Sequence, residues 1–135
     1  MSQRTLVLLK PDAVRRGLVG DILSRFEAKG LSIVAMEQRT IDAGKADEHY
    51  ADHVEKDFYP PLREFVTSGP LVALVLEGDE AIEVVRGING ATDGRKAAPG
   101  TIRGDLSLSN RENLVHGSDS LESADREIAL WFGSL

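Results

Sequence analysis

The residues best suited to chemistry lie in a short segment near the C-terminus, residues 113–120, which reads Asn-Leu-Val-His-Gly-Ser-Asp-Ser. His116 follows a short apolar run that is typical of a strand. Gly117 comes directly after it, and a residue without a side chain leaves one face of the imidazole open. A neutral imidazole held in this way can act as a nucleophile near neutral pH. The segment therefore predicts a reactive histidine at the end of a strand.

A carboxylate on the last predicted helix, Glu127, is placed to orient this imidazole. A carboxylate bonded to one ring nitrogen fixes the tautomer and leaves the other nitrogen free to attack. Ser118 is placed to bridge the two groups. Without His116, Glu127 would be an ordinary solvated helix residue, so its assignment depends on the histidine.

Three cationic residues come from separate parts of the chain: Lys10, Arg86 and Arg103. Arginine suits phosphate because its planar guanidinium makes paired, charge-assisted hydrogen bonds. Each of the three, taken alone, is more typical of a solvated surface charge. Gly100 and Gly104 flank Arg103 and allow the backbone to approach a ligand closely there. The chain has neither of the two common glycine-rich phosphate loops, so any phosphate must be held by side chains such as these.

His49 and His53 are candidates for metal binding rather than phosphate chemistry, because they stand four residues apart in a segment predicted as a helix. This spacing occurs in zinc-binding helices. No glutamate follows the first histidine here and no third ligand is evident, so we do not predict a zinc site. Tyr50 and Phe58 lie in the same region. Aromatic residues are most often core residues, and the alternative for Phe58 is to stack on a flat base at the mouth of a cleft.

Strand-like runs alternate with helical patterns along the chain. The strands are expected at residues 5–9, 31–36, 71–76 and 114–115. The helices are expected at residues 18–29, 42–54, 60–69, 79–87 and 121–131. Removing the helix pair after the second strand and the last helix leaves a βαββαβ order, the ferredoxin-like unit. We therefore predict an α/β (α+β) fold: a four-stranded antiparallel sheet with an inserted helix pair and a C-terminal helix, in one domain of residues 1–135.

The first and third strands are apolar at nearly every position, which is typical of strands covered on both faces. A ferredoxin-like sheet has helices on one face only. We therefore expect a further layer over the second face, and association between subunits is our hypothesis for it.

Composition excludes several classes of function. The chain contains no cysteine, which excludes disulfides, a thiol nucleophile and a cysteine-based zinc site. The net charge of -6 argues against a general nucleic-acid binder, which needs a broad basic field. An RNA-binding module on this fold would carry aromatic residues on its central strands, and residues 5–9 and 71–76 contain none.

Two sequence features predict where in the cell the protein is found. The apolar runs are only strand length, and the N-terminal residues lack the pattern of a secretion signal. We expect a cytoplasmic protein with no membrane partner and no dedicated nucleic-acid site.

Taken together, these residues resemble the nucleoside diphosphate kinase family over essentially the whole chain. The motifs that carry the resemblance are Thr-Leu-Val-Leu-Leu-Lys-Pro-Asp at 5–12, Arg-Gly-Leu-Val-Gly at 16–20, His-Tyr at 49–50 with Phe58, Ser-Gly-Pro at 68–70, Pro-Gly-Thr-Ile-Arg-Gly-Asp at 99–105, the 113–120 segment and Glu-Ile-Ala-Leu-Trp-Phe at 127–132. The strings around Arg103 and His116 are the most specific.

The resemblance implies a ping-pong reaction. His116 would take the γ-phosphate of ATP or another nucleoside triphosphate on its δ nitrogen and pass it to a nucleoside diphosphate. Glu127, Lys10 and Tyr50 would assist, Glu127 by orienting the ring and Tyr50 by helping to position it. The nucleotide-binding residues that the family pattern implies are Lys10 and Asn113 for the ribose, Phe58 for the base, His53 for the α-phosphate, and Arg86, Thr92 and Arg103 for the β- and γ-phosphates.

The resemblance also implies a magnesium ion, Mg2+, held mainly by phosphates and water, with no direct protein ligand and with Asp119 reaching it through water. Stacking tolerates every base because each has a π face, so broad base specificity is expected. The family further implies a homo-oligomer, with a hexamer favoured and a tetramer as the main alternative.

Several positions depart from the family pattern, among them Gly94, Asp57, Leu106 and Asn110. Gly94 lies two residues after Thr92, at a position where family members usually have a proline, and we expect a flexible loop there. Asn110 stands where an apolar residue often flanks the base. The competing hypothesis is a non-catalytic nucleotide-binding or scaffold protein on the same fold. It predicts a lost histidine or lost phosphate clamps, and this chain retains both.

Overall fold

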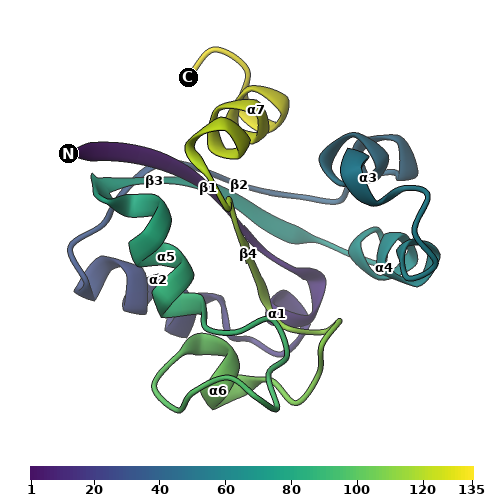
Figure 1. The fold of residues 1–135 in the computed structure, drawn as a ribbon, viewed down its shortest axis with the longest axis horizontal. Helices are drawn as coiled ribbons and strands as arrows, with labels where there is room; N and C mark the ends of the chain where they lie inside the picture. The colour runs from purple at the N-terminus through teal and green to yellow at the C-terminus, as the bar shows by residue number, and fades with distance from the viewer.

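The computed structural model describes residues 1–135 (Figure 1). In chain order the elements are β1 (Ser2–Leu9), α1 (Pro11–Arg15), α2 (Val19–Ala28), β2 (Ser32–Arg39), α3 (Ala43–His49), a 3-10 turn (Ala51–His53), α4 (Tyr59–Val66), β3 (Leu71–Asp79), α5 (Ala81–Asn89), α6 (Ile102–Leu106), β4 (Val115–Gly117) and α7 (Leu121–Phe132). The predicted order of strands and longer helices is confirmed. None of the helices is both long enough and apolar enough to span a lipid bilayer.

The four strands form one antiparallel sheet in the order β2-β3-β1-β4. β1 pairs with β3 along its whole length and with β4 over three residues, which sets His116 opposite Leu8. This is the ferredoxin-like arrangement predicted from the order of the elements. The short β4 is thus fixed against a central strand, and His116 is fixed with it.

Helices of this same chain cover both faces of the sheet (Figure 1). Alternate residues of a strand point to opposite faces, so Val7 and Leu9 join one core cluster while Leu6 and Leu8 join the other. α1, α2, α5 and α6 pack on the first face, and α3, α4 and α7 pack on the second. The subunit hypothesis for the second layer is therefore wrong, because the inserted helix pair and the C-terminal helix supply that layer.

The helix predicted over residues 42–54 is shorter than expected. Asp42 caps it, and its carboxylate accepts a backbone N–H of the first turn at 2.8 Å. α3 nevertheless ends at His49, and a separate 3-10 turn follows. The helix stops where Tyr50 turns into the core, because burying that ring against α4 outweighs another helical turn. The two histidines of this region therefore do not share one helix face.

Leu114, directly before β4, has a φ of 74°, a strained value for a residue with a bulky side chain. The start of α1 holds it in place. The Lys10 N–H donates to the Leu114 carbonyl at 2.8 Å, and the Leu114 N–H donates to Asp12 Oδ2 at 3.1 Å. This clamp sets the positions of Asn113 and His116 relative to Lys10, so the strain lies where side chains from distant segments are brought together.

Gly94 is enclosed rather than flexible. A side chain at this position would collide with Ser107, and the Gly94 N–H donates to the Ser109 carbonyl at 3.1 Å. Next to it, the Arg95 guanidinium pairs with both carboxylate oxygens of Asp93 at 3.0 and 2.8 Å. The glycine is required because the loop passes too close to residues 107–109 for any side chain.

We expect Gly94→Ala to lower the free energy of unfolding by about 1–3 kcal/mol, because the added methyl group overpacks a closed site. Urea unfolding followed by circular dichroism measures this. Gly87→Ala is the matched control: Gly87 lies inside α5 with open space around it, so alanine should stabilise the protein by up to about 1 kcal/mol. If Gly94→Ala were as stable as the unmodified protein, the loop would have to move away from Ser107 freely.

Candidate active site

The predicted site residues all line one cleft of about 810 Å³. They come from the end of β1, the region between α3 and α4, α5 and the loop after it, α6, β4 and α7. The predicted residues in the lining are Lys10, Tyr50, His53, Phe58, Arg86, Thr92, Arg103, Asn113, His116, Asp119 and Glu127. Residues that are far apart in the chain thus converge on one hollow at the end of the sheet.

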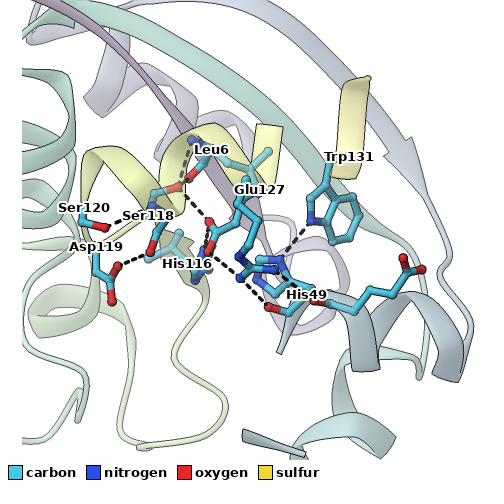
Figure 2. A network of polar contacts seen from close by, with 12 residues as sticks. Leu6, His49, His116, Ser118, Asp119, Ser120, Glu127 and Trp131 are labelled. Atoms are coloured by element: carbon cyan, nitrogen blue, oxygen red, sulfur yellow. Dashed lines mark hydrogen bonds and ion pairs between the residues drawn. The ribbon is translucent and has the colours of Figure 1, made fainter. Parts of the chain in front are cut away.

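The His116 imidazole is held through one nitrogen only. Its Nε2 lies 2.8 Å from Glu127 Oε1, and the same oxygen accepts the Ser118 hydroxyl at 2.7 Å (Figure 2). Glu127 is 5% exposed, and Ser118 is fixed in turn by the Leu6 N–H of β1 at 3.3 Å. An ionised carboxylate only accepts hydrogen bonds, so neutral His116 carries its proton on Nε2. Nδ1 keeps its lone pair, which is the geometry of a nucleophile.

Lys10 and Asn113 form a buried polar pair on one wall of the cleft. Lys10 Nζ donates to Asn113 Oδ1 at 2.8 Å, and the Asn113 amide donates to the Thr92 carbonyl at 2.9 Å. Burial lowers the pKa of Lys10 to about 8, the charge of Arg103 acts in the same direction, and Asp12 opposes them. Burial also raises the pKa of the Asp12 carboxyl.

Backbone carbonyls hold the Arg103 guanidinium, and no carboxylate neutralises it. Nε donates to Asn113 at 3.2 Å, one terminal nitrogen to Gly90 at 2.9 Å, and the other to Val115. Burial, followed by repulsion from Arg86, lowers the pKa of Arg103 to about 10, so it remains a cation at neutral pH. None of the ion pairs of the chain includes Arg86 or Arg103, so both charges are available to an anion.

Aromatic rings form another wall. Phe58 is 51% exposed, and its ring lies 5.4 Å from that of His53, whose Nδ1 lies 3.1 Å from Lys56 Nζ. A half-exposed ring at a cleft offers a flat surface to a planar group. Tyr50 lies deeper, edge-on to His49, with its hydroxyl buried and unpartnered, and burial raises the pKa of that hydroxyl.

Asp119 supplies an exposed carboxylate at the rim of the cleft. The Ser123 hydroxyl donates to its Oδ1 at 2.6 Å. This bond holds the pKa of Asp119 below its usual value, and the charge of Arg86 acts in the same direction. The rim therefore carries the negative charge of Asp119 close to Arg86, which has no ion-pair partner.

The sequence did not indicate that the His49 ring packs on the nucleophile His116. The two rings lie 4.6 Å apart at an angle of 81°. In the sequence, His49 is weighed as a zinc ligand and belongs to one of the family motifs, but it receives no role in the site. One feature of α7 could have indicated a partner for Trp131. This residue stands four residues after Glu127, and a buried indole N–H needs a hydrogen-bond acceptor. Asn89 and Arg126 also line the cleft without having been predicted.

Similar proteins of known sequence share one description. A family model described as "Nucleoside diphosphate kinase" matches residues 3–135. A protein of that name from a Nocardioides species is 81% identical over 135 residues, which are 100% of both chains. Another from Cutibacterium acnes is 62% identical over 133 residues, covering 98% of this chain and 96% of the relative.

Solved structures agree in fold as well as in sequence. A nucleoside diphosphate kinase from Halobacterium salinarum, in complex with CDP, has a TM-score of 0.95 and 50% identity, covering 98% of this chain and 88% of that one. One from Encephalitozoon cuniculi has a TM-score of 0.96 and 37% identity, covering 98% and 90%. The match to the family over nearly every residue, on a fold whose cleft holds a free histidine nitrogen among cations, leads to one conclusion: the chain belongs to the nucleoside diphosphate kinase family.

Proposed function

We propose that this protein transfers the γ-phosphate of a nucleoside triphosphate to a nucleoside diphosphate through a phosphohistidine on His116. The observation that carries the proposal is the state of the imidazole, in which Glu127 holds Nε2 and Nδ1 has no protein partner. Membership of the family supports the reaction class. Its closest rival is a protein that binds nucleotides without catalysis.

The reaction proceeds in two half-reactions. His116 Nδ1 attacks the γ-phosphorus, and an N–P bond forms as the bond to the bridging oxygen breaks and the nucleoside diphosphate leaves. A terminal phosphate oxygen of a second nucleoside diphosphate then attacks the phosphohistidine, which forms a new P–O bond and returns the lone pair to Nδ1. Glu127 accepts the hydrogen bond from the His116 Nε2–H throughout, so it stabilises the ring while the ring carries the phosphoryl group.

The cations of the cleft supply charge neutralisation, on which phosphoryl transfer mainly depends. Arg86 and Arg103 hold the β- and γ-phosphates, since neither has a carboxylate partner. Thr92 joins the two arginines, and His53 lies near the α-phosphate. Lys10 and Asn113 contact the ribose, and Phe58 stacks on the base. Ribose and phosphate contacts carry no information about the base, so purine and pyrimidine nucleotides both serve as substrates.

Magnesium fits this cleft as a partner of the nucleotide. It prefers oxygen ligands and keeps several waters, and the exposed Asp119 carboxylate offers one such oxygen. The cluster of His49, His116 and Glu127 is richer in nitrogen, which suits other metals better. We therefore assign Mg2+ to the phosphates and water, with Asp119 reaching it through water. When bound, the ion neutralises phosphate charge.

We also propose that the single domain of residues 1–135 assembles as a homo-oligomer, as the family resemblance implies. A hexamer is favoured and a tetramer is the main alternative. The mass in solution by light scattering distinguishes the two.

The function is tested by incubating the protein with ATP, magnesium and CDP and separating the products by chromatography. CTP and ADP should form in equal amounts, GDP and UDP should replace CDP, and double-reciprocal plots should give the parallel lines of a ping-pong reaction. Nucleotide binding without CTP formation would overturn the proposal in favour of a non-catalytic role.

We expect Glu127→Ala to slow phosphate transfer by about 10²-fold with little change in KM. The His116 ring is then no longer fixed in one tautomer, while the contacts to the nucleotide remain. Steady-state kinetics with ATP and GDP measures both constants. Glu127→Gln is the milder control, since its amide oxygen can still accept from Nε2. A large rise in KM for Glu127→Ala would show that Glu127 acts on nucleotide binding instead.

The pKa of Lys10 predicts how activity depends on pH. As the pH rises through about 8, the buried ammonium loses its proton and no longer attracts the nucleotide, whereas Arg103 keeps its charge to about 10. We expect kcat/KM to fall over that range. Lys10→Met should have a lower kcat/KM that does not decrease over this pH range. The surface variant Lys29→Met should show the same decrease as the unmodified protein. A flat wild-type profile across this range would contradict the role of Lys10.

A further inference from the structure

We propose that His49 is a positioning residue for the nucleophile: Trp131 fixes its tautomer, and its ring, set perpendicular to that of His116, keeps His116 in the orientation that presents Nδ1 to the cleft. This inference rests on the proposed function of His116. It concerns a buried side chain that the reaction steps above do not use.

The bond from Trp131 determines the protonation of His49. Trp131 Nε1 lies 3.0 Å from His49 Nδ1, and an indole N–H can only donate (Figure 2). His49 Nδ1 therefore accepts, and the ring is the neutral tautomer with its proton on Nε2. His49 is 3% exposed, and burial, with repulsion from His116, holds its pKa well below the usual value.

One face of α7 holds both imidazoles. Glu127 bonds His116 and Trp131 bonds His49, and the two stand four residues apart, one above the other on the helix. The neighbouring Arg126 donates to the His49 carbonyl at 3.2 Å, which ties its main chain to the same helix. The relative placement of the two rings is thus set by a single rigid element.

The second ring supplies a restraint that Glu127 alone does not. A hydrogen bond at Nε2 fixes one point of the His116 ring and leaves it free to tilt about that point. The His49 ring packs against it at 4.6 Å and 81°, a favourable edge-to-face arrangement. Tilting His116 would break that contact. Such control matters because in-line attack is sensitive to small errors in the position of the nucleophile.

The neutral state of His49 also protects the bond between His116 and Glu127. One ring nitrogen of His49, one ring nitrogen of His116 and one carboxylate oxygen of Glu127 all lie within 4.8 Å of one another. Protonation of His49 would place a proton on Nδ1 and break the bond from Trp131, and the positive charge would draw the Glu127 carboxylate away from His116. The groups around His49 are His116, Arg126, Lys10 and His53, all of which act against a positive charge there, and Glu127.

Trp131→Phe tests the proposal, because it keeps a six-membered aromatic ring on α7 and removes the N–H donor together with the smaller ring of the indole. We expect the single-turnover rate of phosphohistidine formation from ATP to fall about tenfold, with KM for ATP unchanged. In 15N NMR spectra, unmodified His49 should show protonated Nε2 and bare Nδ1, without titrating, across pH 6 to 8. In the variant, His49 should show a mixture of tautomers, and the His116 signals should shift because its ring is no longer held in one orientation.

Phe132→Leu is the matched control: it alters the next aromatic residue of α7, which packs on Arg39 and does not line the cleft. It should lose stability and keep the labelling rate. Any of three results overturns the proposal. The first is a labelling rate in Trp131→Phe equal to that of the unmodified protein, and the second is an equal fall of this rate in Phe132→Leu. The third is a His49 that titrates in the unmodified protein. Were the unmodified protein to form no phosphohistidine, the proposed function would fail by itself. Unchanged His116 signals in Trp131→Phe would then overturn the positioning role separately.

Discussion

Replacing His116 by alanine should lower kcat for transfer from ATP to GDP by ~10⁴-fold or more, because the covalent route loses its nucleophile. No other imidazole of the cleft can take its place, and no thiol is present. His49 Nδ1 accepts from Trp131, His53 Nδ1 accepts from Lys56, and the chain has no cysteine. The loss should therefore be close to complete.

Nucleotide binding should survive the same change. The cations that hold the phosphates come from other segments, and Ser118 still donates to Glu127 when the imidazole is gone. Calorimetric titration with ADP should give a Kd similar to that of the unmodified protein, which separates lost chemistry from lost folding. A His116→Ala variant that retained substantial transfer would mean that another group carries the phosphate.

Arg103→Ala should produce the second large effect, and it should do so in two measurements at once. The guanidinium offers an unneutralised charge to the cleft, and losing such a group in phosphoryl transfer lowers kcat by about 10³-fold. The same guanidinium donates to carbonyls of Gly90, Asn113 and Val115. Leaving these without partners should lower the free energy of unfolding by about 1–3 kcal/mol.

Arg103→Lys separates the two contributions. An ammonium keeps the charge but cannot reach three carbonyls in the fixed geometry of a guanidinium. We expect it to recover part of kcat and little of the stability, as measured by ATP-to-GDP kinetics and urea unfolding. If Arg103→Ala lost stability but kept its kcat, Arg103 would be a structural residue rather than a phosphate ligand.

Much of the fold could be predicted from the sequence because its signals are local. The continuous apolar runs at 5–9 and 71–76 predict central strands, and β1 pairs with β3 over its whole length in the structure. The arrangement of His116, Ser118 and Glu127 was also predictable, since all three lie within a short stretch that passes from a strand to a helix.

The remaining features depend on contacts between distant segments, which leave no local pattern. α1 and α6 have five residues each, too few to show a helical period. The left-handed conformation of Leu114 depends on a bond to Asp12 across 102 residues. The second face of the sheet is covered by helices whose docking the strand pattern does not specify. The contact between His49 and His116 likewise exists only once α7 has packed beside α3.

The most direct test of the phosphohistidine is to incubate the protein with γ-labelled ATP and magnesium, without an acceptor, and to isolate the protein. The account predicts a label that is acid-labile and base-stable, that maps to His116, and that is discharged to GTP when GDP is added. Absence of label, label on a residue other than His116, or label that GDP does not remove would contradict it.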